Sequence, residues 1–267
     1  MTIREIVLSL FCVSINLCAY DVATSQTLDL STAKIIDLTH SFDAQTIAWP
    51  TEKTGFELKQ NFKGVTKSGF FYFSNTFCSP EHSGTHLDAP MHFGERSWTS
   101  SDIPVERYVG KAVVIDISRQ SNINPDYALT QDDLKEWETR NGVIPKDAIV
   151  LLRTGWSARW PDKKSYLGDD TPGDVSKLHF PSYSAEAVSF LVSQRGVKMI
   201  GVDTASIDIG QSQDFKVHRI VGAANVPALE NLSDLDRLPE TGATLIALPM
   251  KIGKGSGAPT RVIAFIP

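Results

Sequence analysis

The sequence predicts a mixed α/β domain with a β-rich centre. Three observations support this: strand-like apolar runs outnumber helical patterns, only two helices have clear start signals, and no Gly/Ser-rich or Pro-rich linker divides the chain. A regular alternation of strands and crossover helices is not expected, because the helices are too few. The chain has 267 residues, 42% of them hydrophobic. This is a globular composition, with enough apolar side chains to form a core without disulfides.

The strands are predicted where short runs are rich in valine, isoleucine and aromatic residues and end in turn-forming residues. These runs are Lys34–Leu38, Gly69–Phe77, Ala112–Ile117, Ala148–Arg153, Met199–Val202, Thr244–Leu248 and Val262–Ile266.

The two predicted helices carry terminal signals. Thr130 and Asp133 have the spacing of a capping box, and Trp137 belongs to the apolar face that follows. Ser184 opens the second helix, and Gly196 can end it in the left-handed conformation.

The N-terminal segment has the pattern of a secretory signal peptide. Arg4 lies near the start, an apolar run follows, and the small residues Ala23 to Ser25 resemble a cleavage site. We therefore expect a signal peptide at residues 1–25 and a secreted or periplasmic domain at residues 26–267. An uncleaved anchor is the alternative. The apolar run is short for a membrane span, so no stable membrane partner is expected.

Charge and cysteine content narrow the class of protein further. The formal net charge is −5, and the absence of a basic stripe argues against a nucleic-acid partner. Without the signal peptide, Cys78 is the one cysteine left, so no internal disulfide is expected. Its apolar-aromatic surroundings predict a buried thiol, and Phe71 and Phe73 in the same run are predicted to be core residues.

The stretch HSGTHLDAPMH at residues 82–92 carries the strongest chemical signal. His82, His86 and Asp88 would share one face of an extended strand, whereas Pro90 argues against a helix. A flat strand would hold these side chains too far apart for one ion, so we expect a bend near Gly84. Imidazoles with a carboxylate and no thiolate suit Zn²⁺, Mn²⁺ or Fe²⁺ in a catalytic site. The alternative is that ordinary hydrogen bonds satisfy these histidines.

The same residues resemble the signature H-x-G-T-H-x-D-x-P-x-H of the metal-dependent cyclase family, which includes bacterial kynurenine formamidases and isatin hydrolases. The segments RTGWSARWP at 153–161 and LPMKIGKGSGAP at 248–259 are similar to the isatin hydrolase branch. Four other segments agree with the family: IIDLTH at 35–40, LLRTGW at 151–156, GVDTASID at 201–208 and PALENL at 227–232. The likeness therefore covers nearly all of residues 26–267.

The resemblance implies a swivelling β/β/α fold, a homodimer or homotetramer, and a set of site residues. His82, His86 and Asp88 match the ligands of the first metal ion, and His92 matches a proton-transfer residue. His218 and Glu230 match positions that complete a second metal site with Asp88 in the formamidases. Isatin hydrolases are described with a single Mn²⁺, so the presence of a second metal ion stays open. Zn²⁺ is the alternative ion. Glu230 is the alternative to His92 as the base.

The implied activity is metal-dependent hydrolysis of a small aromatic amide, with isatin opened to isatinate by a metal-activated water. Phe42 and Trp49, in the loop after the first strand, are candidate walls for a flat substrate. Two alternatives stay open. One is an arylformamidase acting on N-formylkynurenine, and the other is a secreted metal-binding or ligand-binding protein without catalysis.

Overall fold

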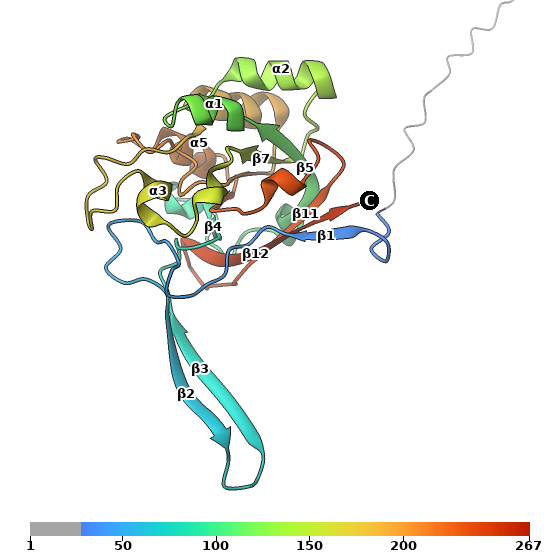
Figure 1. Ribbon diagram of the computed structural model, residues 1–267. Helices are drawn as coiled ribbons and strands as arrows, with labels where there is room; N and C mark the ends of the chain where they lie inside the picture. The colour runs from blue at the N-terminus through green and yellow to red at the C-terminus, as the bar shows by residue number, and fades with distance from the viewer. Residues whose placement is uncertain (1–27) are drawn as a thin grey trace, which may run out of the picture.

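The computed structural model describes residues 28–267, so the predicted signal peptide lies outside the described residues. One curled mixed sheet forms the centre of the molecule, and helices cover its outer face (Figure 1). The predicted α/β domain with a β-rich centre is thus confirmed. No helix between residues 28 and 267 is both long and apolar enough to cross a bilayer.

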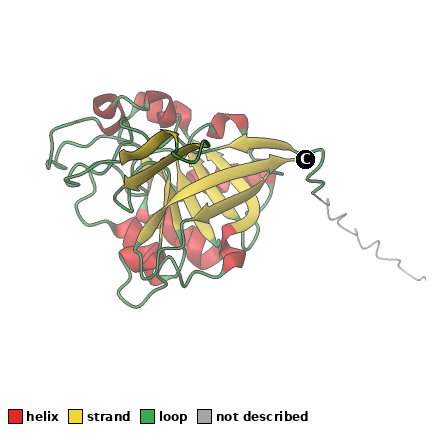
Figure 2. Cartoon of the chain, turned by 90° about the horizontal axis from the view of Figure 1, so that it is seen from below, coloured by secondary structure: helices red, strands yellow, loops and turns green. Residues whose placement is uncertain are grey.

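The sheet is parallel in its middle and antiparallel at its ends. Its order is β1-β12-β11-β5-β7-β9-β10-β4, with β5, β7, β9 and β10 parallel to one another. Because β4 also pairs with β12, the sheet closes into a barrel-like curl (Figure 2). The strands are β1 (Lys34–Asp37), β4 (His86–Asp88), β5 (Val109–Asp116), β7 (Ile149–Arg153), β9 (Met199–Val202), β10 (Ala228–Glu230), β11 (Thr244–Pro249) and β12 (Gly257–Ile266).

Both predicted helices are present with their expected ends. The Thr130 side chain accepts from the Asp133 N–H and the Asp133 carboxylate accepts from the Thr130 N–H, which forms the capping box of α2. A wider turn, Leu191–Arg195, extends α4 to Gly196, whose φ is +62°. The helices are α1 (Ser118–Ile123), α2 (Gln131–Asn141), α3 (Lys163–Leu167), α4 (Ala185–Phe190) and α5 (Lys216–Ala223).

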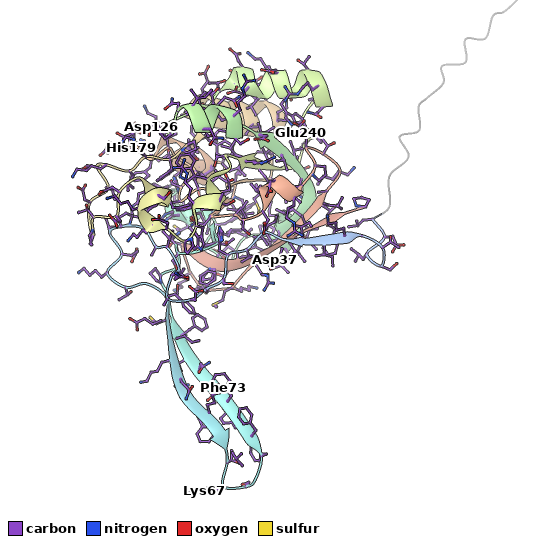
Figure 3. The ribbon with its side chains drawn as sticks, viewed as in Figure 1. Asp37, Lys67, Phe73, Asp126, His179 and Glu240 are labelled. Atoms are coloured by element: carbon purple, nitrogen blue, oxygen red, sulfur yellow. The ribbon has the colours of Figure 1, made fainter. Side chains whose placement is uncertain are left out.

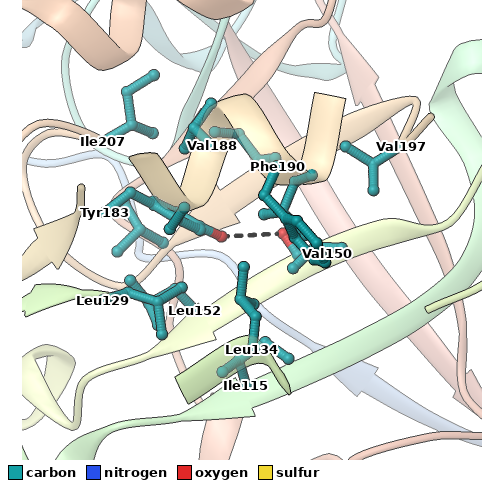
Figure 4. Packing of buried hydrophobic residues seen from close by; sticks show 14 of the residues in the cluster. Ile115, Leu129, Leu134, Val150, Leu152, Tyr183, Val188, Phe190, Val197 and Ile207 are labelled. Atoms are coloured by element: carbon teal, nitrogen blue, oxygen red, sulfur yellow. Dashed lines mark hydrogen bonds between the residues drawn. The ribbon is translucent and has the colours of Figure 1, made fainter. Parts of the chain in front are cut away.

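Two of the buried hydrophobic clusters lie against the sheet, one on each face. On the outer face, side chains of β7 such as Val150 and Leu152 pack against α2, α4 and α5 (Figure 4). Inside the curl, Leu87 and Leu229 pack with other buried residues of the sheet. Tyr183 is fully buried, and its hydroxyl donates toward the carbonyl oxygens of Val150 and Gly201 at 3.1 and 2.8 Å. These bonds remove the cost of burying a polar group.

A two-stranded hairpin, formed by β2 (Glu57–Val65) and β3 (Phe71–Cys78), projects from this body (Figure 1). The predictions that Phe71 and Phe73 are core residues and that Cys78 is a buried thiol are therefore wrong. The two phenylalanines are 64% and 48% exposed, and Cys78 is exposed as well. The apolar run does form a strand. The strand leaves the main sheet, however, and nothing in the described chain covers it.

Candidate metal centre

The signature stretch bends where the sequence predicted a bend. Gly84 has a φ of +56°, and a Cβ there would come within 2.8 Å of the Phe42 ring, so glycine suits both the conformation and the space. The chain then enters β4, which lies between β10 and β12, and His86 is paired directly with Glu230 of β10. Pro90–His92 forms a short 3₁₀ turn that ends the extended segment.

Side chains from three elements converge beside β4. The His82 Nδ1 lies 2.7 Å from Asp88 Oδ1, and the His86 Nε2 lies 3.2 Å from the same oxygen. Glu230 is 3.4 Å from His86 Nε2 through one carboxylate oxygen and 3.3 Å from His218 Nε2 through the other. The His218 Nε2 is also 3.3 Å from Asp88 Oδ2. The structure therefore brings the four predicted ligands and Glu230 into one cluster.

Hydrogen bonds to the outer nitrogens orient two of these imidazoles. The Nδ1 of His86 lies 2.9 Å from the carbonyl oxygen of Gly84, and the Nδ1 of His218 lies 2.7 Å from the carboxylate of Asp208. Carbonyl and carboxylate oxygens can only accept, so each Nδ1 carries a proton and Nε2 is the nitrogen that would present its lone pair to an ion. Such outer partners are typical of metal-ligating histidines. Asp208 ends the segment GVDTASID, and its contact with His218 was not predicted from the sequence.

The cluster contains buried atoms that a cation would satisfy. His86 Nε2 and Asp88 Oδ2 have no hydrogen-bond partner among the described residues, and both side chains are nearly inaccessible. Buried acceptors without a partner are costly. Neutral imidazoles with carboxylates are the donors that Zn²⁺ and Mn²⁺ accept, so the residues fit a divalent ion.

The donor positions suit either one ion or two. His82, Asp88 and His92 are close enough to share an ion, and so are His86, Asp88 and Glu230. Asp88 belongs to both groups. A second ion would therefore share Asp88 with the first.

The electrostatics of the cluster also favour positive charge. Burial opposes charge on His86, Asp88 and Glu230, but attraction between imidazoles and carboxylates outweighs it. The pKa of His86 is raised to about 10, and the pKa of Asp88 is held well below its usual range. The pKa of Glu230 is lowered too, although burial and the charge of Asp88 oppose this. A divalent cation would replace the imidazole protons as the counter-charge and release them.

A cavity of about 230 Å³ opens onto the cluster. Aromatic side chains line part of its wall, and Trp49 is one of them. Phe42, the other predicted wall residue, is not among the lining residues and packs edge-on against Phe56. Two further wall residues were not predicted from the sequence: Phe93, which directly follows the signature, and Phe215, which precedes α5. Nearness to His92 and His218 was the signal that could have identified them.

His92 lies between the cavity and the cluster. Its ring stacks on His82 with the centroids 3.8 Å apart, and it meets Phe93 and His218 edge-on. The side chain keeps an exposed edge, but crowding by these rings disfavours the charged form and lowers the pKa of His92 to about 4. His92 is therefore neutral at pH 7, with a lone pair on one ring nitrogen.

Comparisons with known proteins agree with this architecture. Residues 36–209 match the model of the Cyclase family. An isatin hydrolase of Roseibium aggregatum is 35% identical over 207 residues, which are 74% of this chain and 77% of that protein. A kynurenine formamidase of Salinibacter ruber is 26% identical over 238 residues, covering 86% and 96% of the two chains. The solved isatin hydrolase A of Ralstonia solanacearum superposes with a TM-score of 0.81 at 34% identity, covering 92% and 100%.

Proposed function

Since the chain belongs to the cyclase family and is a metal-dependent hydrolase of C–N bonds in amides, we propose that it opens a cyclic amide, with isatin as substrate and isatinate as product. The observation that carries this proposal is the aromatic-walled cavity that ends on the metal cluster. Its volume and apolar wall suit a small flat ring system. The similarity to the isatin hydrolase of Roseibium aggregatum supports the same substrate.

The residues that would hold the ion are His82, His86 and Asp88, with His218 and Glu230 facing the same space. When bound, a divalent cation would polarise the lactam carbonyl and lower the pKa of a water molecule. We propose Mn²⁺ as this ion. Zn²⁺ is the alternative, since the donor set accepts both ions.

His92 is the proposed proton carrier. Hydrolysis adds a water oxygen to the lactam carbon and breaks the C–N bond, so one proton must leave the water and one must reach the nitrogen. The imidazole of His92 borders the cavity, and its ring nitrogens can take up one proton and deliver another. Glu230 is less suited to this role, because one of its carboxylate oxygens already accepts from the Ile207 N–H and both face histidines of the cluster. This supports Glu230 as a ligand.

Isatin hydrolysis by residues 26–267 tests the proposal. The protein is stripped of metal and then given Mn²⁺ or Zn²⁺, and the absorbance of isatin is followed. We expect isatin to disappear only when metal is restored, with the stripped protein as the control. Turnover of N-formylkynurenine without turnover of isatin would make the protein a formamidase. Retention of metal and ligand without turnover of either compound would indicate a binding protein.

We further propose that the projecting hairpin holds two copies of the chain together. The pairs Leu58–Phe77, Lys63–Phe73 and Val65–Phe71 lie directly across the two strands, so these side chains share one face. The apolar members of this face are between 48% and 70% exposed. A two-stranded hairpin is at best marginally stable alone, and a large exposed apolar face marks an interface.

A second copy is the occupant that the hairpin best fits. Strand β2 has nine residues, so the arm is about 30 Å long, enough to reach across another copy of the body. Figure 3 shows Lys67 at the tip and Phe73 on the arm, far from the body of its own chain. Two arms related by a two-fold axis would each cover the other's apolar face, as closed dimers require.

Replacing both Phe71 and Phe73 with aspartate is expected to convert a dimer into a monomer, because charges would replace the centre of the buried face. Light scattering coupled to size exclusion measures the mass. Thr76→Asp is the matched control, since it adds a charge to the opposite face of the same strand and should leave the dimer intact. A monomeric unmodified protein would refute the arm as a dimer contact.

A further inference from the structure

A short chain of hydrogen bonds reaches the metal cluster from outside. The Glu81 carboxylate accepts from the backbone N–H of Ser256 at 2.9 Å and from its hydroxyl at 2.7 Å. The hydroxyl oxygen of Ser256 lies 2.8 Å from Nε2 of His82, which is 174 residues away in the sequence. Glu81 directly precedes the signature, whereas Ser256 lies just before β12. The three side chains therefore join two distant loops at the edge of the cluster.

The direction of each hydrogen bond follows from counting protons. An ionised carboxylate can only accept, so Ser256 donates its one hydroxyl proton to Glu81. The Ser256 oxygen must then accept from His82, which places a proton on Nε2. The other nitrogen, Nδ1, lies 2.7 Å from an Asp88 oxygen that can only accept, so a proton or a cation must lie between the two atoms. A divalent ion would take the place of that proton on Nδ1.

The backbone around Ser256 is shaped to allow this contact. A Cβ on Gly257 would lie 2.5 Å from Cε1 of His82, and a Cβ on Gly255 would lie 2.7 Å from Oε1 of Glu81. The two glycines that flank Ser256 thus leave the space in which the imidazole and the carboxylate sit. Ser100 also holds this loop, because its hydroxyl bonds to the carbonyl oxygens of Gly255 and Gly257.

We propose that Glu81 and Ser256 are positioning residues that hold His82 in the Nε2–H tautomer, so that His82 ligates the divalent ion through Nδ1. This inference rests on the metal centre of the proposed function. His86 and His218 present the other nitrogen, Nε2, because their Nδ1 atoms are engaged. The cluster thus combines two kinds of imidazole donor. The segment that contains Ser256 provides no metal ligand, but it makes one of the contacts that orient the ligands of the cluster.

Metal affinity measures this role without reference to turnover. We expect Ser256→Ala and Glu81→Gln to weaken Mn²⁺ binding by about 10- to 100-fold, the usual effect of removing such an outer partner. Electron paramagnetic resonance of free Mn²⁺ gives the dissociation constant for the full chain. Ser256→Thr keeps a hydroxyl and should restore binding. Ser101→Ala is the matched control, because Ser101 contacts the same loop through the Lys254 N–H but does not touch His82.

The tautomer itself gives a second readout. Side-chain ¹H–¹⁵N spectra of the metal-free protein should show His82 protonated on Nε2, and Zn²⁺ should shift the resonance of its Nδ1. In Ser256→Ala the tautomer preference should be lost. A Zn²⁺-induced shift at Nε2 of His82, or Mn²⁺ affinity in both variants within twofold of the unmodified protein, would overturn the inference. A protein that binds Mn²⁺ in this way but does not turn over isatin would refute the proposed substrate and leave the inference standing.

Discussion

His86→Ala is expected to abolish metal retention and hydrolysis together. His86 is 2% exposed, and its Nε2 lies between the carboxylates of Asp88 and Glu230. Alanine would remove a ligand and leave two buried carboxylates facing each other without an imidazole between them, which is unfavourable. We expect metal content near zero by elemental analysis. The kcat/KM should fall at least about a thousandfold, because the ion supplies much of the transition-state stabilisation.

His179→Ala is the matched control for this variant. His179 pairs with Asp126 on the surface (Figure 3) and belongs to neither group of candidate ligands. It should keep both metal and activity. Circular dichroism of both variants separates loss of metal from loss of fold. If folded His86→Ala retained a normal metal content, His86 would not be a ligand.

His92→Ala has the second large expected effect: metal should be kept while kcat falls by about 10²- to 10⁴-fold, the usual contribution of a general acid or base. The ligands His82, His86 and Asp88 would remain in place. The side chain lost is the one that borders the cavity and is neutral at pH 7. Metal analysis with steady-state kinetics on isatin measures both quantities, and KM should change much less than kcat.

His92→Gln sharpens this test, because glutamine can hydrogen bond but cannot carry a proton at neutral pH. It should be as slow as His92→Ala if proton transfer is the role that matters. Loss of metal in both variants would instead make His92 a ligand with His82 and Asp88, which lie close enough to share an ion with it. An unchanged kcat in His92→Ala would remove the proton-transfer role and favour Glu230 as the base.

The sequence predicted correctly those helix ends and bends that depend on residues only a few positions apart. The capping box at Thr130 and the left-handed Gly196 depend on contacts between neighbours in the chain, so the sequence contains them completely. The bend at Gly84 is of the same kind. The strand β10 was missed, since it has only three residues and no periodicity can be read from so short a run.

The aromatic run at Phe71 and Phe73 shows where such patterns fail. Alternating apolar residues predict a strand correctly, because the preference belongs to the backbone and its own side chains. Whether that strand is buried depends on what packs against it. In this chain the hairpin leaves the sheet, so residues with a core-like pattern are exposed.

The sequence by itself determined the candidate ligands His82, His86 and Asp88, because spacing along one bent strand is limited by covalent geometry. The resemblance to the family added His218 and Glu230. Only the tertiary structure decided which nitrogen each imidazole presents and what forms the cavity wall. Asp208 orients His218, Ser256 contacts His82, and Phe215 lines the cavity, all from other segments of the chain. The physical reason is that tautomer, burial and charge depend on the atoms within a few ångströms of a group. Packing, and not sequence distance, brings those atoms together.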